Sequence, residues 1–143
     1  MIRLENINES NWRIPLSVSG AQKRYVANST TILARAYAYR EARSRAFLVV
    51  ARGIAVGMGL YHDDSEMDAY IFSELFIDQR YQGKGYGKAA TRLVLDELRR
   101  DGRFRKVVLC YIEGSEAAKN LYEGFGFEET ARDEDEIIME LEL

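Results

Sequence analysis

The stretch Arg80-Tyr-Gln-Gly-Lys-Gly-Tyr-Gly-Lys88 carries three closely spaced glycines between an apolar segment that ends at Ile77 and a helical pattern that follows. Glycine lets a backbone come close to a ligand, and successive amides at a helix N-terminus form an anion-binding cradle. We therefore expect this strand–turn–helix unit to bind a diphosphate. A glycine-rich turn without a ligand is the alternative that this stretch alone leaves open.

Two other phosphate-binding motifs do not match this turn. A Walker A loop requires Gly-Lys followed by Ser or Thr, but Ala89 follows Gly87-Lys88 here. A dinucleotide fingerprint requires Gly-x-Gly-x-x-Gly near the first strand, whereas these glycines stand at 83, 85 and 87, halfway along the chain. The turn therefore indicates a phosphate ligand of another kind.

The pattern around the turn predicts a mixed α/β fold in a single domain, residues 1–143. Asn8 or Ser10 is expected to cap a helix through Trp12. The helix after the turn is expected at about 86–100 and should place Tyr86, Ala90, Leu93, Val94 and Leu98 on one face. Strands are expected at 2–4, 46–51, 54–61, 67–77, 106–112, 127–130 and 137–141, and further helices at 30–43 and near 118–125.

Composition narrows the class of protein. The 20 basic and 23 acidic side chains give a net charge of -3, which argues against a nucleic-acid partner. Cys110 and His62 are the only cysteine and histidine, so we expect no disulfide and no metal site. No apolar run approaches the roughly 20 residues that span a bilayer, and no secretion signal is evident, so we expect a cytoplasmic protein that does not bind membranes.

Residues 71–130 resemble the GNAT superfamily of acetyl-CoA-dependent N-acetyltransferases. The family signature Arg/Gln-x-x-Gly-x-Gly/Ala is matched by Arg80, Gly83 and Gly85. The downstream segment Ala118–Phe127 is similar to the family pattern A-x-x-L-Y-x-x-x-G-F. The two motifs stand in the family's order and at its spacing, which makes the pair far more specific than the glycine turn alone.

The resemblance implies a central, mostly antiparallel, twisted sheet of six to seven strands with about four helices. It also implies acetyl-CoA as cosubstrate and no metal. Many relatives carry Asn at the position of Ser115, where serine offers one donor fewer. The implied cofactor contacts are Leu75, Phe76, Ile77, Gln82, Gly83, Lys84, Gly85, Tyr86, Gly87, Lys88 and Ser115.

Two residues are the candidates for catalysis. By the resemblance, Tyr122 is the general acid that protonates the leaving thiolate; packing in the core is its alternative role. Glu74 stands in an apolar strand, where burial would raise its pKa toward that of a useful base. Strand alternation places Glu74 on the opposite face from Leu75 and Ile77 unless a bulge intervenes, so a solvated or salt-bridged role remains open.

The acceptor is expected to be a small-molecule amine, with a polyamine such as spermidine or spermine favoured by the resemblance. The acidic residues Asp63, Asp64, Glu66 and Asp68 could form a cation-binding rim or a solubilising loop. Another small amine, a protein N-terminus, a lysine, or a non-catalytic acyl-CoA-binding module are the alternatives. A homodimer is left open.

Overall fold

The computed structural model describes all residues from 1 to 143. The strands are β1 (Ile2–Asn6), β2 (Arg45–Ala51), β3 (Ile54–Asp64), β4 (Ala69–Ile77), β5 (Lys106–Ile112), β6 (Glu128–Asp133) and β7 (Glu136–Glu142). The α-helices are α1 (Ser29–Ala38), α2 (Tyr86–Asp101) and α3 (Glu116–Gly124), and the short 3-10 turns are η1 (Gly20–Gln22), η2 (Arg40–Ala42) and η3 (Gln79–Tyr81).

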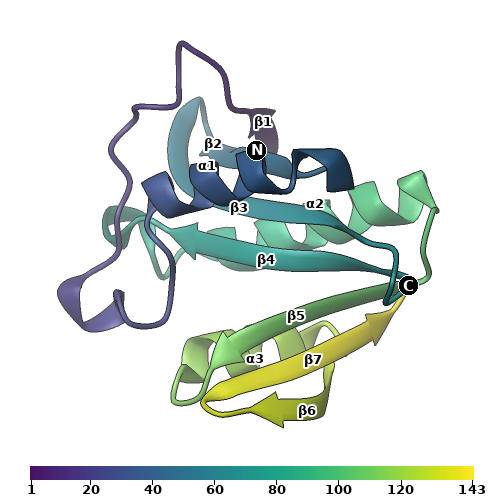
Figure 1. Cartoon of the computed structure of the whole chain (residues 1–143). Coiled ribbons are helices and arrows are strands. Elements are labelled where there is room, and N and C mark those ends of the chain that lie inside the picture. Colours follow the sequence, from purple (N-terminus) through teal and green to yellow (C-terminus); the bar gives the residue numbers. More distant parts are fainter.

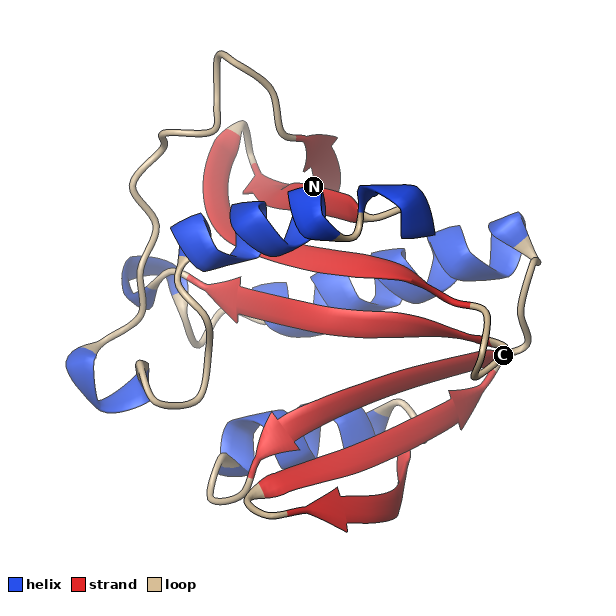
Figure 2. Cartoon of the chain, viewed as in Figure 1, coloured by secondary structure: helices blue, strands red, loops and turns tan.

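All seven strands belong to one sheet in the order β1-β2-β3-β4-β5-β7-β6. Every neighbouring pair is antiparallel except β4 and β5, which run parallel. One face carries α1, and the opposite face carries α2 and α3 (Figures 1 and 2). The predicted mixed α/β class and strand number are thus confirmed, with three α-helices in place of about four. No helix is both long and apolar enough to cross a bilayer.

The sheet opens between β4 and β5. These strands pair only where Tyr70 and Ile71 lie opposite Val107 and Val108, and beyond that point they diverge (Figure 1). A register shift against β3 leaves Ser73 as an extra residue in β4, two residues after the pairing with β5 ends. Because a bulge bends its strand and increases the local twist, this one turns the second half of β4 away from β5.

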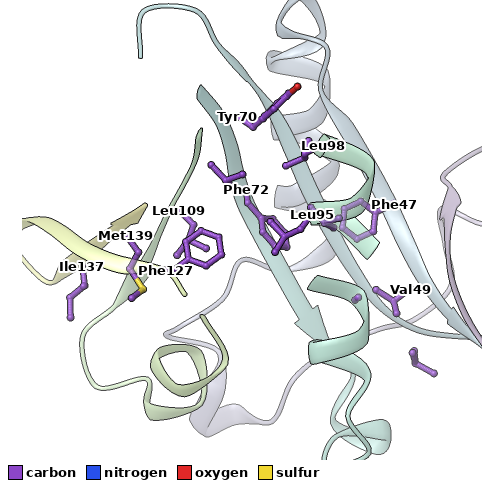
Figure 3. Close-up of a cluster of buried hydrophobic side chains, with 14 of the residues drawn as sticks. Phe47, Val49, Tyr70, Phe72, Leu95, Leu98, Leu109, Phe127, Ile137 and Met139 are labelled. Atoms are coloured by element: carbon purple, nitrogen blue, oxygen red, sulfur yellow. The ribbon is translucent and has the colours of Figure 1, made fainter. Parts of the chain in front are cut away.

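Two hydrophobic cores cover the two faces of the sheet. The larger lies under α2, which buries Ala90, Val94, Leu95 and Leu98 against residues such as Phe72 (Figure 3). The smaller forms around Ile32 of α1, together with Leu48, Met58, Leu60 and Phe76. Each face of the sheet is therefore packed against a helix.

The buried face of α2 differs in part from the prediction. Leu95, which is absent from the predicted face, is fully buried, and Leu93 is only half-buried. Thr91 is also buried, and its hydroxyl donates to the carbonyl of Gly87 one turn earlier. This bond lets a polar residue occupy the core-facing stripe without an unpaired group.

The N-terminal helix predicted from Asn8 or Ser10 through Trp12 is wrong. The Asn8 side chain accepts from the Ser10 amide, and the Asn11 side chain accepts from the Asn8 amide. These local bonds compete with helix formation, so the chain makes only a turn there.

Two predicted boundaries were also too long. The helix expected at 30–43 ends at Ala38, because Tyr39 leaves the helical conformation (φ -99°, ψ 20°). The chain then forms η2, which ends at the left-handed Arg43 (φ 52°). The strand expected at 67–77 begins at Ala69, because Asp68 is also left-handed (φ 50°) and belongs to the hairpin turn.

Candidate active site

A cavity of about 170 Å³ lies at the opening between β4 and β5. Its floor comes from Leu75 and Ile77 of β4 and from Gly87 of α2. Its wall is one face of α3, from the N-cap residue Ser115 to Tyr122. The remaining lining residues are Val18, Gln22, Tyr25, Val26, Gln82, Ala117, Ala118 and Leu121. An elongated, mostly apolar ligand would fit between the strands with polar groups at both ends.

The turn at the mouth of this cavity is built around Asp78. This buried carboxylate accepts from the backbone amides of Ser17 and Arg80 and from the Arg80 guanidinium. Burial would raise the pKa of Asp78, but these hydrogen bonds outweigh it and hold the pKa below its usual value. Arg80 also donates to the carbonyl of Pro15. The signature arginine therefore shapes the turn from within.

The start of α2 offers open backbone donors. Gly85 caps the helix in a left-handed conformation (φ 82°), and the Ala89 amide makes the first intrahelical bond, to the Gly85 carbonyl. No side chain caps this end, so the amides from Tyr86 to Lys88 have no helical partner. This is the cradle that a diphosphate requires, and the exposed cations Lys84 and Lys88 lie beside it.

Gly83 also needs its glycine character, since its φ is 79°. Gly87 is different, because its φ is ordinary for a helix. A Cβ there would lie 3.8 Å from Ile77 and 3.9 Å from Leu121, which is normal van der Waals contact. The residue is thus free of folding constraints, and its missing side chain leaves room in the cavity.

The second half of β4 presents alternate side chains to the two faces. Leu75 and Ile77 line the cavity, whereas Phe76 is buried in the smaller core under α1. Of the predicted cofactor residues, Phe76 could therefore contribute only its backbone. Because β4 has no β5 partner beyond Ile71, its backbone groups on that edge are free for a ligand, apart from the Ile77 carbonyl, which accepts from Gln82.

Glu74 lies on the α1 side of β4, opposite Leu75 and Ile77, as alternation predicts. The bulge at Ser73 comes before it and does not reverse this arrangement. Its side chain is only 10% exposed and pairs with Arg35 of α1. Burial raises the pKa of Glu74, while Arg35 and a hydrogen bond from the Ala27 backbone oppose the rise. The carboxylate is thus a base of increased strength next to the open edge of the sheet.

Tyr122 lines the cavity from α3. Its ring packs edge-on against Phe72 and Phe127, with centroid distances of 6.2 and 5.7 Å. Burial, and to a smaller extent the charge of Glu74, raise the pKa of Tyr122, so the phenol is neutral at physiological pH. The Tyr122 hydroxyl makes no hydrogen bond to the protein. Because every fully buried side-chain oxygen has a hydrogen-bond partner, this hydroxyl is accessible, and it is accessible from the cavity that Tyr122 lines. Tyr122 therefore lines the cavity, whereas Glu74 is absent from its lining and acts on Tyr122 through its charge.

Ser115 caps α3 and lines the cavity. Its hydroxyl oxygen accepts from the Ala118 amide at 3.4 Å. Since a hydroxyl that accepts one bond still has a proton to donate, Ser115 keeps a donor for a ligand carbonyl.

Sequence reasoning missed the segment that covers the cavity, residues 17–28. Its Gln22 side chain exchanges two amide hydrogen bonds of 3.0 Å with Gln82 of the glycine turn. Its Tyr25 crosses the opening and packs against Gly114, at the end of β5. No motif or periodicity marks these residues, because their role depends on where the loop lies in space.

The acidic rim proposed for a polyamine lies elsewhere. Asp63 and Asp64 pair with Tyr70 and Ala69 at the start of β4, the end remote from Leu75. Asp63 is buried and bound by Arg43 and Arg103, and Asp64 accepts from the Met67 amide within the hairpin turn. These carboxylates stabilise the hairpin and do not line the cavity.

The comparisons with known proteins agree with this geometry. The model of the acetyltransferase (GNAT) family matches residues 4–127. Spermine/spermidine N(1)-acetyltransferase of Bacillus subtilis is 32% identical over 68 residues, which are 48% of this chain and 45% of that relative. The match thus spans about half the length of the relative.

Two solved structures share the whole architecture. The ribosomal-protein-S18-alanine N-acetyltransferase of Escherichia coli superposes with a TM-score of 0.74 at 20% identity, covering 99% of this chain and 94% of that one. A GNAT family acetyltransferase of Elizabethkingia anophelis, with acetyl-CoA bound, gives 0.72 at 13% identity, covering 99% and 98%. The family match extends from within β1 to Phe127, three residues beyond α3, so the chain belongs to the GNAT family of acetyltransferases.

Proposed function

We propose that residues 1–143 act as one domain that transfers an acetyl group from acetyl-CoA to a primary amine, most suitably a polyamine. The observation that carries this proposal is the cavity at the β4–β5 opening. It brings the uncapped N-terminus of α2 and Tyr122 to one cavity, and Glu74 is near enough for its charge to raise the pKa of Tyr122.

The cofactor residues divide by chemistry. The amides from Tyr86 to Lys88 would hold the diphosphate, with Lys84 and Lys88 adding charge. The unpaired edge of β4 would hold the pantetheine arm, and its Leu75 amide would polarise the thioester carbonyl in the manner of an oxyanion hole. Gln82 has a different role, because its amide group donates to the Ile77 carbonyl at 2.8 Å and fixes the turn.

Glu74 would prepare the acceptor. An alkylammonium has a pKa of about 10.4, so at neutral pH a proton must leave before the nitrogen can attack. Glu74 takes that proton from the ammonium, directly or through water, and becomes a neutral carboxylic acid. Burial favours this step because it disfavours the charged carboxylate.

Tyr122 would complete the reaction. Acetyl-CoA supplies an activated acetyl group whose C–S bond breaks as the amine nitrogen forms the new C–N bond. The Tyr122 hydroxyl gives its proton to the departing thiolate, whose pKa is about 8.5 when free. In the balance, one ammonium proton ends on the thiol and a second passes through Glu74 to solvent.

The acid and the base are coupled through their charges. The Glu74 carboxylate contributes to the raised pKa of Tyr122. When Glu74 accepts the proton from the acceptor, its negative charge is lost and Tyr122 becomes a stronger acid. Deprotonation of the amine therefore prepares Tyr122 for protonation of the leaving group.

The polyamine assignment draws support from the Bacillus relative, and the remote position of Asp63 and Asp64 removes one expected source of charge recognition. A protein N-terminal amine is the second candidate, because the Escherichia coli structure with the same architecture is named for that substrate.

Thiol release from acetyl-CoA tests the proposal with a panel of spermidine, spermine, amino acids and lysine peptides. We expect turnover with spermidine and spermine at higher kcat/KM than with the other amines. Turnover with the peptides alone would show that the acceptor is a peptide amine and not a polyamine. Binding of acetyl-CoA by calorimetry without thiol release for any amine would show an acyl-CoA-binding module in place of an enzyme.

A further inference from the structure

The candidate base is paired with a single arginine that has no other partner. Arg35 of α1 contacts Glu74, and this is the only hydrogen bond or ion pair of its side chain. The arginines of the structural ion pairs are held more firmly. Arg43 bridges Asp63 and Asp101, and Arg45 binds both Asn6 and Glu97. Of these three arginines, only Arg35 would be released by the loss of a single partner.

The two partners differ in their exposure. The Glu74 side chain is 10% exposed and the Arg35 side chain is 49% exposed. A nearly buried carboxylate without a cation is costly, whereas a half-exposed guanidinium on a flexible stem is readily solvated. Glu74 thus needs a positive charge at this position, but that charge need not come from Arg35.

We propose that Arg35 is a displaceable counter-ion. It pairs with Glu74 in the position that the acceptor's ammonium group takes, and it leaves when the acceptor binds. This inference rests on the role of Glu74 given above. The exchange keeps the carboxylate paired at every stage. It makes Arg35 a positioning residue that selects acceptors arriving as cations, because a neutral molecule could not replace it.

The other groups around Glu74 are compatible with this exchange. From the segment before α1, the Ala27 amide donates to the carboxylate. From β5 and α3, Cys110 and Tyr122 feel its charge, and both have raised pKa values, first through burial and then through nearby carboxylates. On β3, the residue opposite Glu74 is the apolar Leu60. Arg35 is thus the only cation that acts on the carboxylate.

The departure of Arg35 also strengthens the base. Burial raises the pKa of Glu74, and Arg35 opposes that rise. When the acceptor's ammonium gives up its proton with Arg35 displaced, no fixed cation remains to stabilise the carboxylate. Proton transfer to Glu74 is therefore easier after the exchange than before it.

Arg35→Gln and Arg35→Lys test the exchange. Glutamine keeps most of the length and hydrogen bonding without the charge, and lysine keeps the charge. Arg40→Gln is the matched control, because Arg40 lies in the adjacent η2, stacks on Tyr37 and has no carboxylate partner. All three variants should bind acetyl-CoA with the wild-type Kd, which shows that the fold and the cofactor site are intact.

We expect Arg35→Gln to lower KM for spermidine and for propylamine by about three- to tenfold, since the competing cation is gone. The acid limb of kcat/KM against pH should move to higher pH, because Glu74 titrates at a higher pKa without Arg35. Arg35→Lys should restore most of the wild-type values, and Arg40→Gln should match wild type.

Unchanged KM and an unchanged acid limb in Arg35→Gln would overturn the exchange while leaving the acetyltransferase proposal intact. An increased KM for alanine, but not for alanine amide, would instead assign Arg35 to a carboxylate on the acceptor and also overturn it. Calorimetry of spermidine with the CoA-bound protein keeps the test independent of turnover. Tighter binding by Arg35→Gln supports the exchange even if no acetylation occurs, and equal binding contradicts it.

Discussion

Removal of the Tyr122 hydroxyl by Tyr122→Phe should separate chemistry from folding. The edge-on contacts of the ring with Phe72 and Phe127 persist in phenylalanine, and the lost hydroxyl bonds no protein group. We therefore expect stability to change by less than about 0.5 kcal/mol. Loss of a positioned proton donor costs about 10²–10⁴ in rate. That loss raises the barrier by about 2.7–5.4 kcal/mol.

The assay is thiol release in a single turnover, so that slow product release cannot hide the chemical step. Acetyl-CoA affinity, measured by calorimetry, should stay at the wild-type value. Tyr25→Phe is the control, because Tyr25 lines the same cavity. A Tyr122→Phe protein that keeps its rate within about threefold would refute the acid role. A large loss in Tyr25→Phe instead would move that role to the covering segment.

Gly87→Ala should raise the melting temperature through helix propensity, yet weaken acetyl-CoA binding about 10- to 150-fold if the new methyl group costs one charge-assisted amide contact. Gly124→Ala, in open space on α3, is the control and should leave the affinity unchanged. Equal affinities of Gly87→Ala and wild type by calorimetry would contradict the cradle. Glu74→Gln should lower kcat at neutral pH by about 10²–10⁴. It should also abolish the acid limb of the pH profile, because in wild type kcat falls as the pH decreases through the raised pKa of Glu74. An acid limb that persists in the variant would identify another base. Asp64→Asn and Asp68→Asn should leave kcat/KM for spermidine within about twofold, since both residues lie in the hairpin remote from the cavity; a rise in KM for spermidine but not for propylamine would restore the acidic rim.

The sequence predicted the elements that bury an apolar stripe. The strand 106–112 matches β5 residue for residue, and the helix at 86–100 differs from α2 by one residue. The apolar pattern of such an element lies in its own contiguous residues, so it can be recognised without the structure. The failed helix at Asn8 depends instead on two short-range side-chain bonds, those of Asn8 and Asn11. A propensity argument cannot distinguish these bonds from a helix cap, because asparagine favours both.

The residues of the candidate site divide into local motifs, which the sequence could indicate, and long-range contacts, which it could not. The glycine turn and Tyr122 stand in contiguous motifs, and the structure brings Gly87 and Tyr122 to one cavity, while their roles stay predictions. The contact of Gln22 with Gln82 joins residues 60 positions apart, and that of Arg35 with Glu74 joins residues 39 apart. Neither pair has a pattern that either residue could reveal alone. The acidic rim failed for the same reason, since Asp63 is neutralised by Arg43 and Arg103 from distant segments.

The position of Glu74 explains why the split sheet suits a two-substrate reaction. In a continuous sheet, a side chain on the α1 face would be separated by the sheet from Tyr122 on the α3 face. The loss of pairing beyond Ile71 opens the sheet beside Leu75, and the charge of Glu74 raises the pKa of Tyr122. Strand alternation, which argued against Glu74 as a base, would then be an advantage. It would leave the Leu75 side to the thioester and place the proposed base on the α1 side, from which an amine would approach.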